Sequence, residues 1–391
     1  MFETTIDLQQ NRLQTIQGLL RTLMVEGALD ALLVPMLQQT GNVAPMLVSD
    51  PDALDQADPL APVLPINAAR AAAHLTVTGH KQKLGLVLRP CEIRALVELV
   101  KFQQVKLDNA VIIGIDCLGA YPLTAWQDAG SKQHLVDALL DGAVTGEISP
   151  FEGTVFRAAC QICEQPLPEG DHVALSIGLV GVEPDKLYLK AEDSLAQALG
   201  LAPGGAPTAR AHAVDRLIAA RVTARDAAFD AFRRRVDSMD GFLQEFSTCI
   251  RCHNCMINCP ICYCKECIFR TPTFEHDSQL FYQWAERKGT VRMMPDTLLF
   301  HLTRLNHMAS SCVGCGICTE VCPVDIPVGT VFRSVGQKVQ ALFDYHPGRS
   351  LEEAAPVQEF REDELTALGE SCLLYSSPSP RDQREQRVWR R

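Results

Sequence analysis

"CIRCHNCMINCP" (residues 249–260) and "CVGCGICTEVCP" (residues 312–323) share one cysteine spacing, in which three cysteines recur at intervals of three and a fourth precedes a proline. Three thiolates at this spacing wrap the chain around one corner of a four-iron cube, and the fourth cysteine serves the neighbouring cluster. The repeated motif therefore predicts two 4Fe–4S clusters. We assign Cys249, Cys252, Cys255 and Cys322 to one cluster, and Cys312, Cys315, Cys318 and Cys259 to the other.

Zinc is the alternative for these eight cysteines. A tetrahedral zinc ion usually takes pairs of ligands from separated CxxC knuckles, whereas each motif here places four cysteines within eleven residues. The chain has sixteen cysteines in 391 residues, and cytosolic thiols stay reduced and free to bind metal. We therefore expect iron–sulfur clusters in a cytoplasmic protein, and neither zinc nor disulfides at the repeated motif.

The first motif is extended by "ICYCKEC" (residues 261–267), which adds Cys262, Cys264 and Cys267. These three thiols either bind another cluster, join Cys160 and Cys163 in a shared site, bind zinc, or pack as inert side chains. The spacing does not rank these alternatives, and ligation is the interpretation that we prefer.

The N-terminal half alternates apolar strands with amphipathic helices. Residues 31–34, 84–88 and 110–115 have strand character, and helices are expected at 8–26 and from residue 90. This alternation predicts an α/β domain with a mainly parallel sheet, and ligands of such sheets collect at the carboxyl ends of the strands. Cys91 and Cys117 each follow a strand at that edge.

Two further cysteines form "CQIC" (residues 160–163). Together with the two strand-end cysteines, Cys160 and Cys163 complete a third 4Fe–4S site, unless they form a redox-active dithiol or stay as buried thiols. Arg89 and Asp116, beside the strand-end cysteines, either contact the phosphate or ring of a cofactor or form a loop ion pair. His301 and His307 are expected to be surface residues or neighbours of the ligands.

The remaining pattern defines the domain organisation. "HVALSIG" (172–178) and "KLYLK" (186–190) fit half-exposed strands. Residues 209–238 have a helical pattern, and the apolar face consists of Val214, Ile218, Val222, Phe229, Phe232 and Val236. We predict an α/β domain over 1–205, a bridging helix within 206–245, a two-cluster domain over 246–350 and a largely disordered tail over 351–391. From residue 371 the tail resembles translated sequencing-adapter sequence, so Cys372 is given no role.

Composition excludes several classes of function. The formal charge of −11 argues against nucleic-acid binding, and no apolar run approaches the ~18 residues needed to span a bilayer. The first residues, "MFETTIDLQQNR", have neither the basic region nor the apolar core of a signal peptide. The sequence contains no GxGxxG, P-loop, GxSxG or HExxH motif.

Three segments, "LGLVLRPCEIRAL" (84–96), "AVIIGIDCLGAY" (110–121) and "CQICEQPLPEGDHVALSIG" (160–178), resemble the beta-subunit family of deazaflavin-reducing hydrogenases and formate dehydrogenases. The stretch "PDTLLFHLTRLNHMASSCVGCGICTEVCPVDIPVGTVF" (295–332) is similar to the helical two-cluster ferredoxin of heterodisulfide reductase subunits. The resemblance implies an α+β protein with an N-terminal α/β domain and a mostly helical dicluster ferredoxin domain. It also implies an FAD, and it strengthens the assignment of the third cluster.

This resemblance leads to a functional prediction. The chain is expected to be an electron-transfer subunit that passes electrons between a catalytic formate dehydrogenase or hydrogenase subunit and a soluble coenzyme or a heterodisulfide-reductase-like partner. The alternative is a cluster-only adaptor without its own flavin, which the scattered glycines of "TIQGLLRTLMVEGALD" (15–30) favour.

Overall fold

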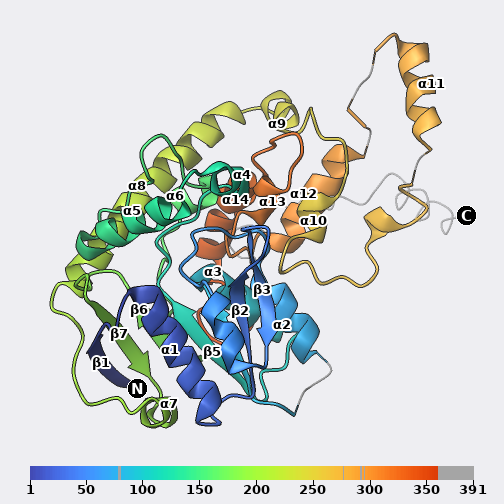
Figure 1. The fold of residues 1–391 in the computed structure, drawn as a ribbon. Helices are drawn as coiled ribbons and strands as arrows, with labels where there is room; N and C mark the ends of the chain where they lie inside the picture. The colour runs from blue at the N-terminus through green and yellow to red at the C-terminus, as the bar shows by residue number, and fades with distance from the viewer. Residues whose placement is uncertain (78–80, 276, 291–292, 295, 360–391) are drawn as a thin grey trace, which may run out of the picture.

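A seven-stranded sheet organises the N-terminal half of the protein (Figure 1). The computed structural model describes residues 1–77, 81–275, 277–290, 293–294 and 296–359. The strand order across the sheet is β1-β7-β6-β5-β4-β2-β3. The strands are β1 (Phe2–Asp7), β2 (Ala31–Leu37), β3 (Val43–Val48), β4 (Leu84–Leu88), β5 (Ala110–Ile115), β6 (Val173–Gly178) and β7 (Lys186–Ala191).

The four central strands β2, β4, β5 and β6 run parallel to one another. At one edge β3 pairs antiparallel with β2, and at the other β7 pairs antiparallel with β6 and β1 with β7. The predicted α/β domain with a mainly parallel sheet is therefore confirmed, with antiparallel strands added at both edges. Strands β1 and β3 were not predicted from the sequence.

Helices cover both faces of this sheet. In the N-terminal half they are α1 (Arg12–Val25), η1 (Pro51–Gln56), α2 (Ala68–Thr76), α3 (Pro90–Lys101), α4 (Leu123–Asp128), α5 (Lys132–Thr145), α6 (Ala158–Gln161) and α7 (Asp193–Ala198). In the C-terminal half they are α8 (Arg210–Arg235), α9 (Met239–Glu245), α10 (Asn254–Ile257), η2 (Ile268–Arg270), α11 (Ser278–Lys288), α12 (Thr297–Met308), α13 (Ile317–Glu320) and α14 (Val328–Leu342).

Alternate side chains of the parallel strands enter two separate cores, because successive residues of a strand point to opposite faces. One core contains Ile113 of β5 and is closed by α1, α5 and α7. The other contains Ile112 of the same strand, α2 and α3, and continues into Phe300 and Val331 of the C-terminal half. The two halves of the chain therefore share one hydrophobic core.

The prediction of a half-exposed strand over 172–178 is wrong for β6. All six residues of β6 are buried, because the strand lies between β5 and β7 in the sheet. A strand covered on both faces is apolar throughout instead of alternating.

Helix α8 connects the two halves and packs against α5, α6 and α14 (Figure 1). Its buried positions in the first half of the helix are Ala213, Leu217 and Arg221. In the first half of the helix the predicted apolar face is displaced from this stripe by one residue, since Val214, Ile218 and Val222 are only partly buried. In the second half the prediction is confirmed at Phe229 and Phe232, which are buried. The smaller Ala213 allows closer approach to α5, while Arg221 donates from Nη2 to the carbonyl oxygen of Leu118 across 2.9 Å.

The chain after α14 returns to the N-terminal half. Ala355 is fully buried, and Gln358 donates from its side-chain amide to the carbonyl oxygen of Lys101 across 2.5 Å. Residues 351–358 therefore pack against the end of α3, although the sequence predicted that they belong to a largely disordered tail. The predicted disorder of 360–391, and Cys372, lie outside the described residues. Within the part of the chain that the structure describes, no helix is both long and apolar enough to cross a membrane.

Candidate metal centre and adjoining cavities

The fifteen described cysteines are all free thiols, and twelve of them gather in three groups of four. The first group combines the three leading cysteines of the first motif with the last cysteine of the second: Cys249, Cys252, Cys255 and Cys322. Burial raises the pKa of Cys255, and the other three members of the group add to that rise. These four thiols therefore lie close together, in the combination that the spacing predicted.

The second group is the complementary set of Cys259, Cys312, Cys315 and Cys318. Burial raises the pKa of Cys315 to about 12, with Cys259 and Cys312 contributing. Burial and the three other members raise the pKa of Cys318 well above its ordinary value. The short helices α10 and α13, which carry equivalent positions of the two motifs, pack against each other, and this contact brings the last cysteine of each motif to the opposite group.

Local backbone conformation explains how each motif wraps its group. Arg251 and His253 in the first motif have φ values of 53° and 60°, and Gly314 and Gly316 at the equivalent positions of the second have 70° and 71°. Both motifs therefore use the left-handed region at the same two places. This conformation is strained for an arginine or a histidine. The first motif therefore adopts it at a cost in the free energy of folding, which the second motif avoids because it has glycine at both positions.

The third group consists of Cys91, Cys117, Cys160 and Cys163. Cys91 lies in the first turn of α3 directly after β4, and Cys117 follows β5, so the carboxyl ends of neighbouring parallel strands bring these two together. All four line one cavity of about 30 Å³, and Cys315 of the second group lines the same cavity. The structure thus brings together the four scattered cysteines and places them beside the dicluster region.

A single metal ion does not match these groups. Among the described residues, no three His, Cys, Asp or Glu side chains converge closely enough to hold one ion. Thiolates bound to one zinc ion at ~2.3 Å lie within about 4 Å of each other, whereas thiolates around a four-iron cube stand farther apart. The donor sets, four thiols in each group, fit 4Fe–4S clusters.

Two buried arginines lie between the groups, and the sequence analysis did not identify them. Arg304 of α12 donates from Nη1 to Sγ of Cys255 across 3.1 Å and from Nη2 to the carbonyl oxygen of the same residue across 2.9 Å. Its charge also lowers the pKa of Cys259 in the second group, against the larger effect of burial. Arg157 lines the cavity of the third group and donates to the carbonyl oxygen of Cys315 across 3.3 Å.

His301 was expected to be a surface residue or a neighbour of the ligands, and it is the latter. Its Nε2 lies 3.3 Å from Sγ of Cys249, and its ring stacks on Phe246 with centroids 4.0 Å apart. Burial and the nearby arginine lower its pKa to about 3, so the imidazole is neutral. His307 is exposed.

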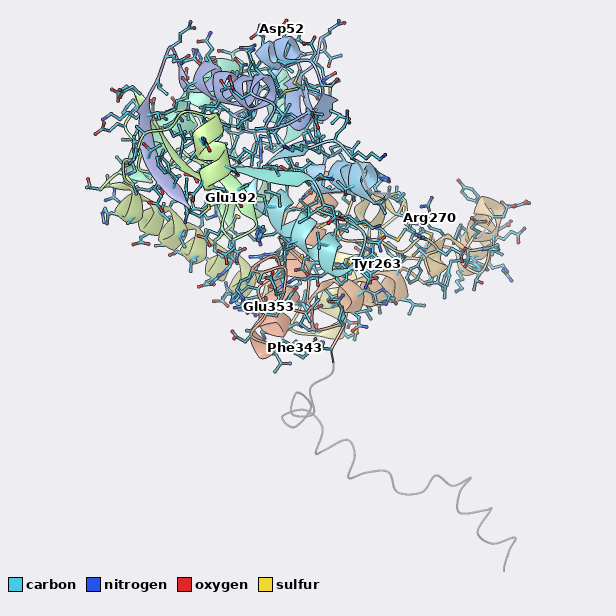
Figure 2. All side chains as sticks on the ribbon, turned by 90° about the horizontal axis from the view of Figure 1, so that it is seen from below. Asp52, Glu192, Tyr263, Arg270, Phe343 and Glu353 are labelled. Carbon is cyan, nitrogen blue, oxygen red and sulfur yellow. The ribbon has the colours of Figure 1, made fainter. Side chains whose placement is uncertain are left out.

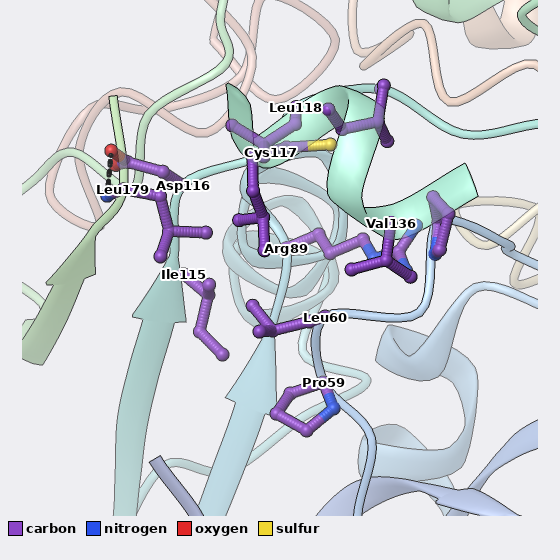
Figure 3. Close-up of a pocket in the computed structure, with 13 residues that line it drawn as sticks. Pro59, Leu60, Arg89, Ile115, Asp116, Cys117, Leu118, Val136 and Leu179 are labelled. Carbon is purple, nitrogen blue, oxygen red and sulfur yellow. Dashed lines mark hydrogen bonds between the residues drawn. The ribbon is translucent and has the colours of Figure 1, made fainter. Parts of the chain in front are cut away.

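Arg89 and Asp116, the residues suggested for a flavin, differ in how fully they are engaged (Figure 3). Asp116 accepts hydrogen bonds from the backbone N–H of Leu179 and Val180 and pairs with Arg210 across 2.7 Å. Its carboxylate is therefore engaged by protein groups, as expected if Asp116 forms an ion pair and does not contact a cofactor. Arg89 donates from Nη2 to the carbonyl oxygen of Ala61, while its buried Nη1 has no hydrogen-bond partner among the described residues.

Three cavities form a row that ends at the third group. The outermost has a volume of about 630 Å³ and is lined by residues 8–13 and by α5. It shares Leu60, Val136 and Leu140 with an inner cavity of about 20 Å³. The inner cavity in turn shares Arg89 and Cys117 with the cavity of the third cysteine group. The cavities are therefore neighbours, separated by side chains that they share, between the outer cavity and the four thiols.

Comparison with known proteins supports this interpretation. Residues 245–326 match the family model of the 4Fe-4S dicluster domain. The F420-dependent formate dehydrogenase subunit beta of Methanocaldococcus jannaschii is 27% identical over 295 residues, which cover 68% of this chain and 74% of that protein. The F420-dependent formate dehydrogenase 1 subunit beta of Methanococcus maripaludis is 27% identical over 320 residues, which cover 74% and 76%.

A structure of the F420-reducing (NiFe) hydrogenase complex from Methanosarcina barkeri also matches, with 14% sequence identity and a TM-score of 0.43 over 61% of this chain and 94% of that one. This score is too low to carry an argument. The fold and the cysteine groups define an α+β iron–sulfur protein with a helical dicluster domain. The predicted resemblance to beta subunits of formate dehydrogenases is confirmed by the two curated relatives.

Proposed function

We propose that this chain is the iron–sulfur electron-transfer subunit of a formate dehydrogenase complex, and that its three cysteine groups hold three 4Fe–4S clusters. The observation that carries the proposal is the contiguity of the groups. Cys315 belongs to the second group and lines the cavity of the third. Burial raises the pKa of Cys91 in that cavity, and Cys315 adds to the rise. Such an arrangement supports stepwise transfer of single electrons between the N-terminal half and the dicluster domain.

The partners follow from the chemistry and from the relatives. The primary oxidation is assigned to a catalytic formate dehydrogenase or hydrogenase subunit, because grouped thiols suit the passage of single electrons and the relatives are named as beta subunits of formate dehydrogenases. The electrons are delivered to a soluble deazaflavin coenzyme, as the names of the relatives suggest, or to a heterodisulfide-reductase-like subunit. A cytoplasmic location stays a prediction from the thiol content.

An FAD in the row of cavities is the finer part of the proposal. A bound flavin supplies an exchange of either one or two electrons. The volume of about 630 Å³ lies in the range of cofactor sites, which is about 300–1,000 Å³. Leu60, Val136 and Leu140 would form the apolar wall. Arg89 lines only the two inner cavities, so its unpartnered Nη1 would donate to a flavin only after a shift of the side chains between them.

The cluster-only adaptor is the second candidate, and one observation favours it. The inner cavity between the outer one and Cys117 measures about 20 Å³, which is space for about one water molecule. A flavin ring cannot occupy it without a shift of the surrounding side chains. The adaptor would use the same clusters and leave the outer cavity empty.

The test is a determination of iron, acid-labile sulfide and flavin in the chain purified without oxygen together with its catalytic subunit. We expect at least about twelve irons for the three groups, one FAD, and cluster EPR signals that appear on addition of formate. Cys117→Ser should remove about four irons and leave those of the dicluster domain. An iron-free protein, or clusters that formate does not reduce, contradicts the proposal, whereas full iron without flavin identifies the adaptor.

A further inference from the structure

The dicluster domain contains three cysteines more than two clusters require. Residues 245–326, which match the 4Fe-4S dicluster model, include Cys262, Cys264 and Cys267 in addition to the eight of the repeated motif. All three line a single open cavity of about 480 Å³. Among the described residues that line it there is no fourth cysteine. None of the three lines the cavity of the third group, so they do not join Cys160 and Cys163.

The segment that carries these thiols is anchored on both sides. Ile261 before it is buried, and the ring of Tyr263 stacks on Phe102 with centroids 4.7 Å apart. Phe269 after it is buried and packs edge-on against Phe300 with centroids 5.1 Å apart. Tyr263 and Arg270 lie on the side of the molecule from which α11 projects (Figure 2). The three thiols are therefore held at a surface position by the core and are not carried on a free loop.

The surroundings of the cavity are cationic. Arg70 of α2, Lys265 and Arg270 line it, and the single carboxylate among the described lining residues is that of Glu266. Arg304, which contacts the first cysteine group, also lowers the pKa of Cys262 against the larger effect of burial. Positive charges would have no role beside three inert thiols. A metal centre bound by thiolates has a net negative charge, which Arg70, Lys265 and Arg270 would neutralise.

The cavity also lies next to the two ligand groups of the dicluster domain. It is lined by Met256, which directly follows Cys255 of the first group, and the backbone N–H of Cys262 donates to the carbonyl oxygen of Cys259 of the second group across 3.3 Å. Cys264 is exposed. Cys267 lies with its Sγ 3.5 Å from Sδ of Met256.

We propose that Cys262, Cys264 and Cys267 bind an additional iron–sulfur cluster through three thiolates, with its remaining coordination position open to solvent. This inference rests on the proposed electron-transfer function. Zinc fits less well, because a structural zinc ion is enclosed by four protein ligands and the three thiols, like those of the three groups of four, do not converge on a single point. The site lies at the surface, next to residues that adjoin both groups of the dicluster domain.

Differential alkylation of the anaerobically purified full chain, in complex with its catalytic subunit, tests the proposal without any mutation. Iodoacetamide is applied before and after removal of iron by a chelator, and the modified cysteines are identified by mass spectrometry. We expect Cys264, although exposed, to react only after iron removal, together with Cys262 and Cys267. Rapid alkylation of Cys264 in the iron-loaded protein would overturn the inference.

A variant provides the second measurement. The triple change of Cys262, Cys264 and Cys267 to serine should lower iron and sulfide by about three to four per chain, with the EPR signals of the other clusters retained. Tyr263→Phe, which keeps the ring on Phe102, is the matched control and should retain full iron. An unchanged iron content, or a loss of zinc in place of iron, contradicts the additional cluster. An iron-free wild-type chain would instead refute the proposed function itself.

Discussion

A Cβ atom on Gly316 would lie 2.2 Å from the Cβ atom of Ala159. Gly316 separates two cysteines of the second group, and Ala159 directly precedes Cys160 of the third. The absence of a side chain at this position therefore allows the second and third groups to approach each other. The φ value of 71° adds a second reason for glycine, because this conformation is unfavourable for residues with a Cβ atom.

Gly316→Ala should separate these two groups. We expect a free energy of unfolding about 1–3 kcal/mol lower than in the control, because the added methyl overpacks a buried contact, and we expect a loss of iron from the third group. Gly200→Ala is a matched control, since its φ of 62° imposes a similar backbone strain with no atom within 4 Å. The free energy of unfolding is measured in urea under nitrogen, and the iron content is measured in both variants. Equal effects of the two changes would contradict the expected separation of the groups and would show that the loss comes from backbone strain alone.

Arg304→Gln should lower the reduction potential of the cluster held by the first group. A positive charge stabilises the reduced, more negative state, and the glutamine keeps a donor while removing the charge. Replacement of a charged hydrogen-bond donor by a neutral one weakens the bond by about 1 kcal/mol, which corresponds to roughly 40 mV for one electron. EPR-monitored redox titration measures the shift. Arg234→Gln, on the exposed face of α8, should leave the potential unchanged, and an equal potential in both variants would refute the role of Arg304.

Paired substitutions distinguish the exchanged ligand sets from sets confined to one motif. Cys249→Ser with Cys322→Ser should cost about four irons, because both residues serve one cluster, whereas Cys312→Ser with Cys322→Ser should cost about eight. If each motif supplied all four of its own ligands, the two results would be reversed. Iron content per chain in the two double variants is the measurement.

His172 should make stability fall in mild acid. Burial lowers its pKa in the folded protein, while the unfolded chain takes up the proton near the ordinary value of about 6.5. Below that value the unfolded state binds more protons, so the free energy of unfolding decreases as the pH falls towards the lowered pKa. His172→Gln removes this proton uptake, and its urea midpoint should change less between about pH 7.5 and about pH 5.5. Parallel curves for the variant and the wild type would contradict the expectation. His172 lies just before β6, at the amino ends of the parallel strands, whereas Cys91 and Cys117 lie at their carboxyl ends.

The cysteine spacing and the strand topology predicted much of the site. The exchange of Cys259 and Cys322 between the groups follows from the repeated motif, because the fourth cysteine of such a motif serves the neighbouring cluster. The meeting of Cys91 and Cys117 follows from the rule that neighbouring parallel strands end at one edge of the sheet. In both cases a local pattern determines a contact between distant residues.

Arg304 and Arg157, the two buried arginines between the cysteine groups, were missed for a physical reason. An arginine in an amphipathic helix is expected to be on the solvent face, since burial of an unpaired charge is costly. The available signal was position: Arg304 follows Phe300 by four residues and His301 by three, on the buried stripe of α12. A charge on that stripe indicates an anionic partner inside the protein. The edge strands β1 and β3 were missed because they are only partly buried and therefore lack the continuous apolar run of the central strands.

The core that joins the sheet to the dicluster half has a consequence for how the protein comes apart. Cys255 is buried in that core together with Phe300 and Leu86. Because both halves supply side chains to this core, unfolding of either half would expose the apolar surface of the other to water. The two halves are therefore expected to lose their structure together, as one cooperative unit.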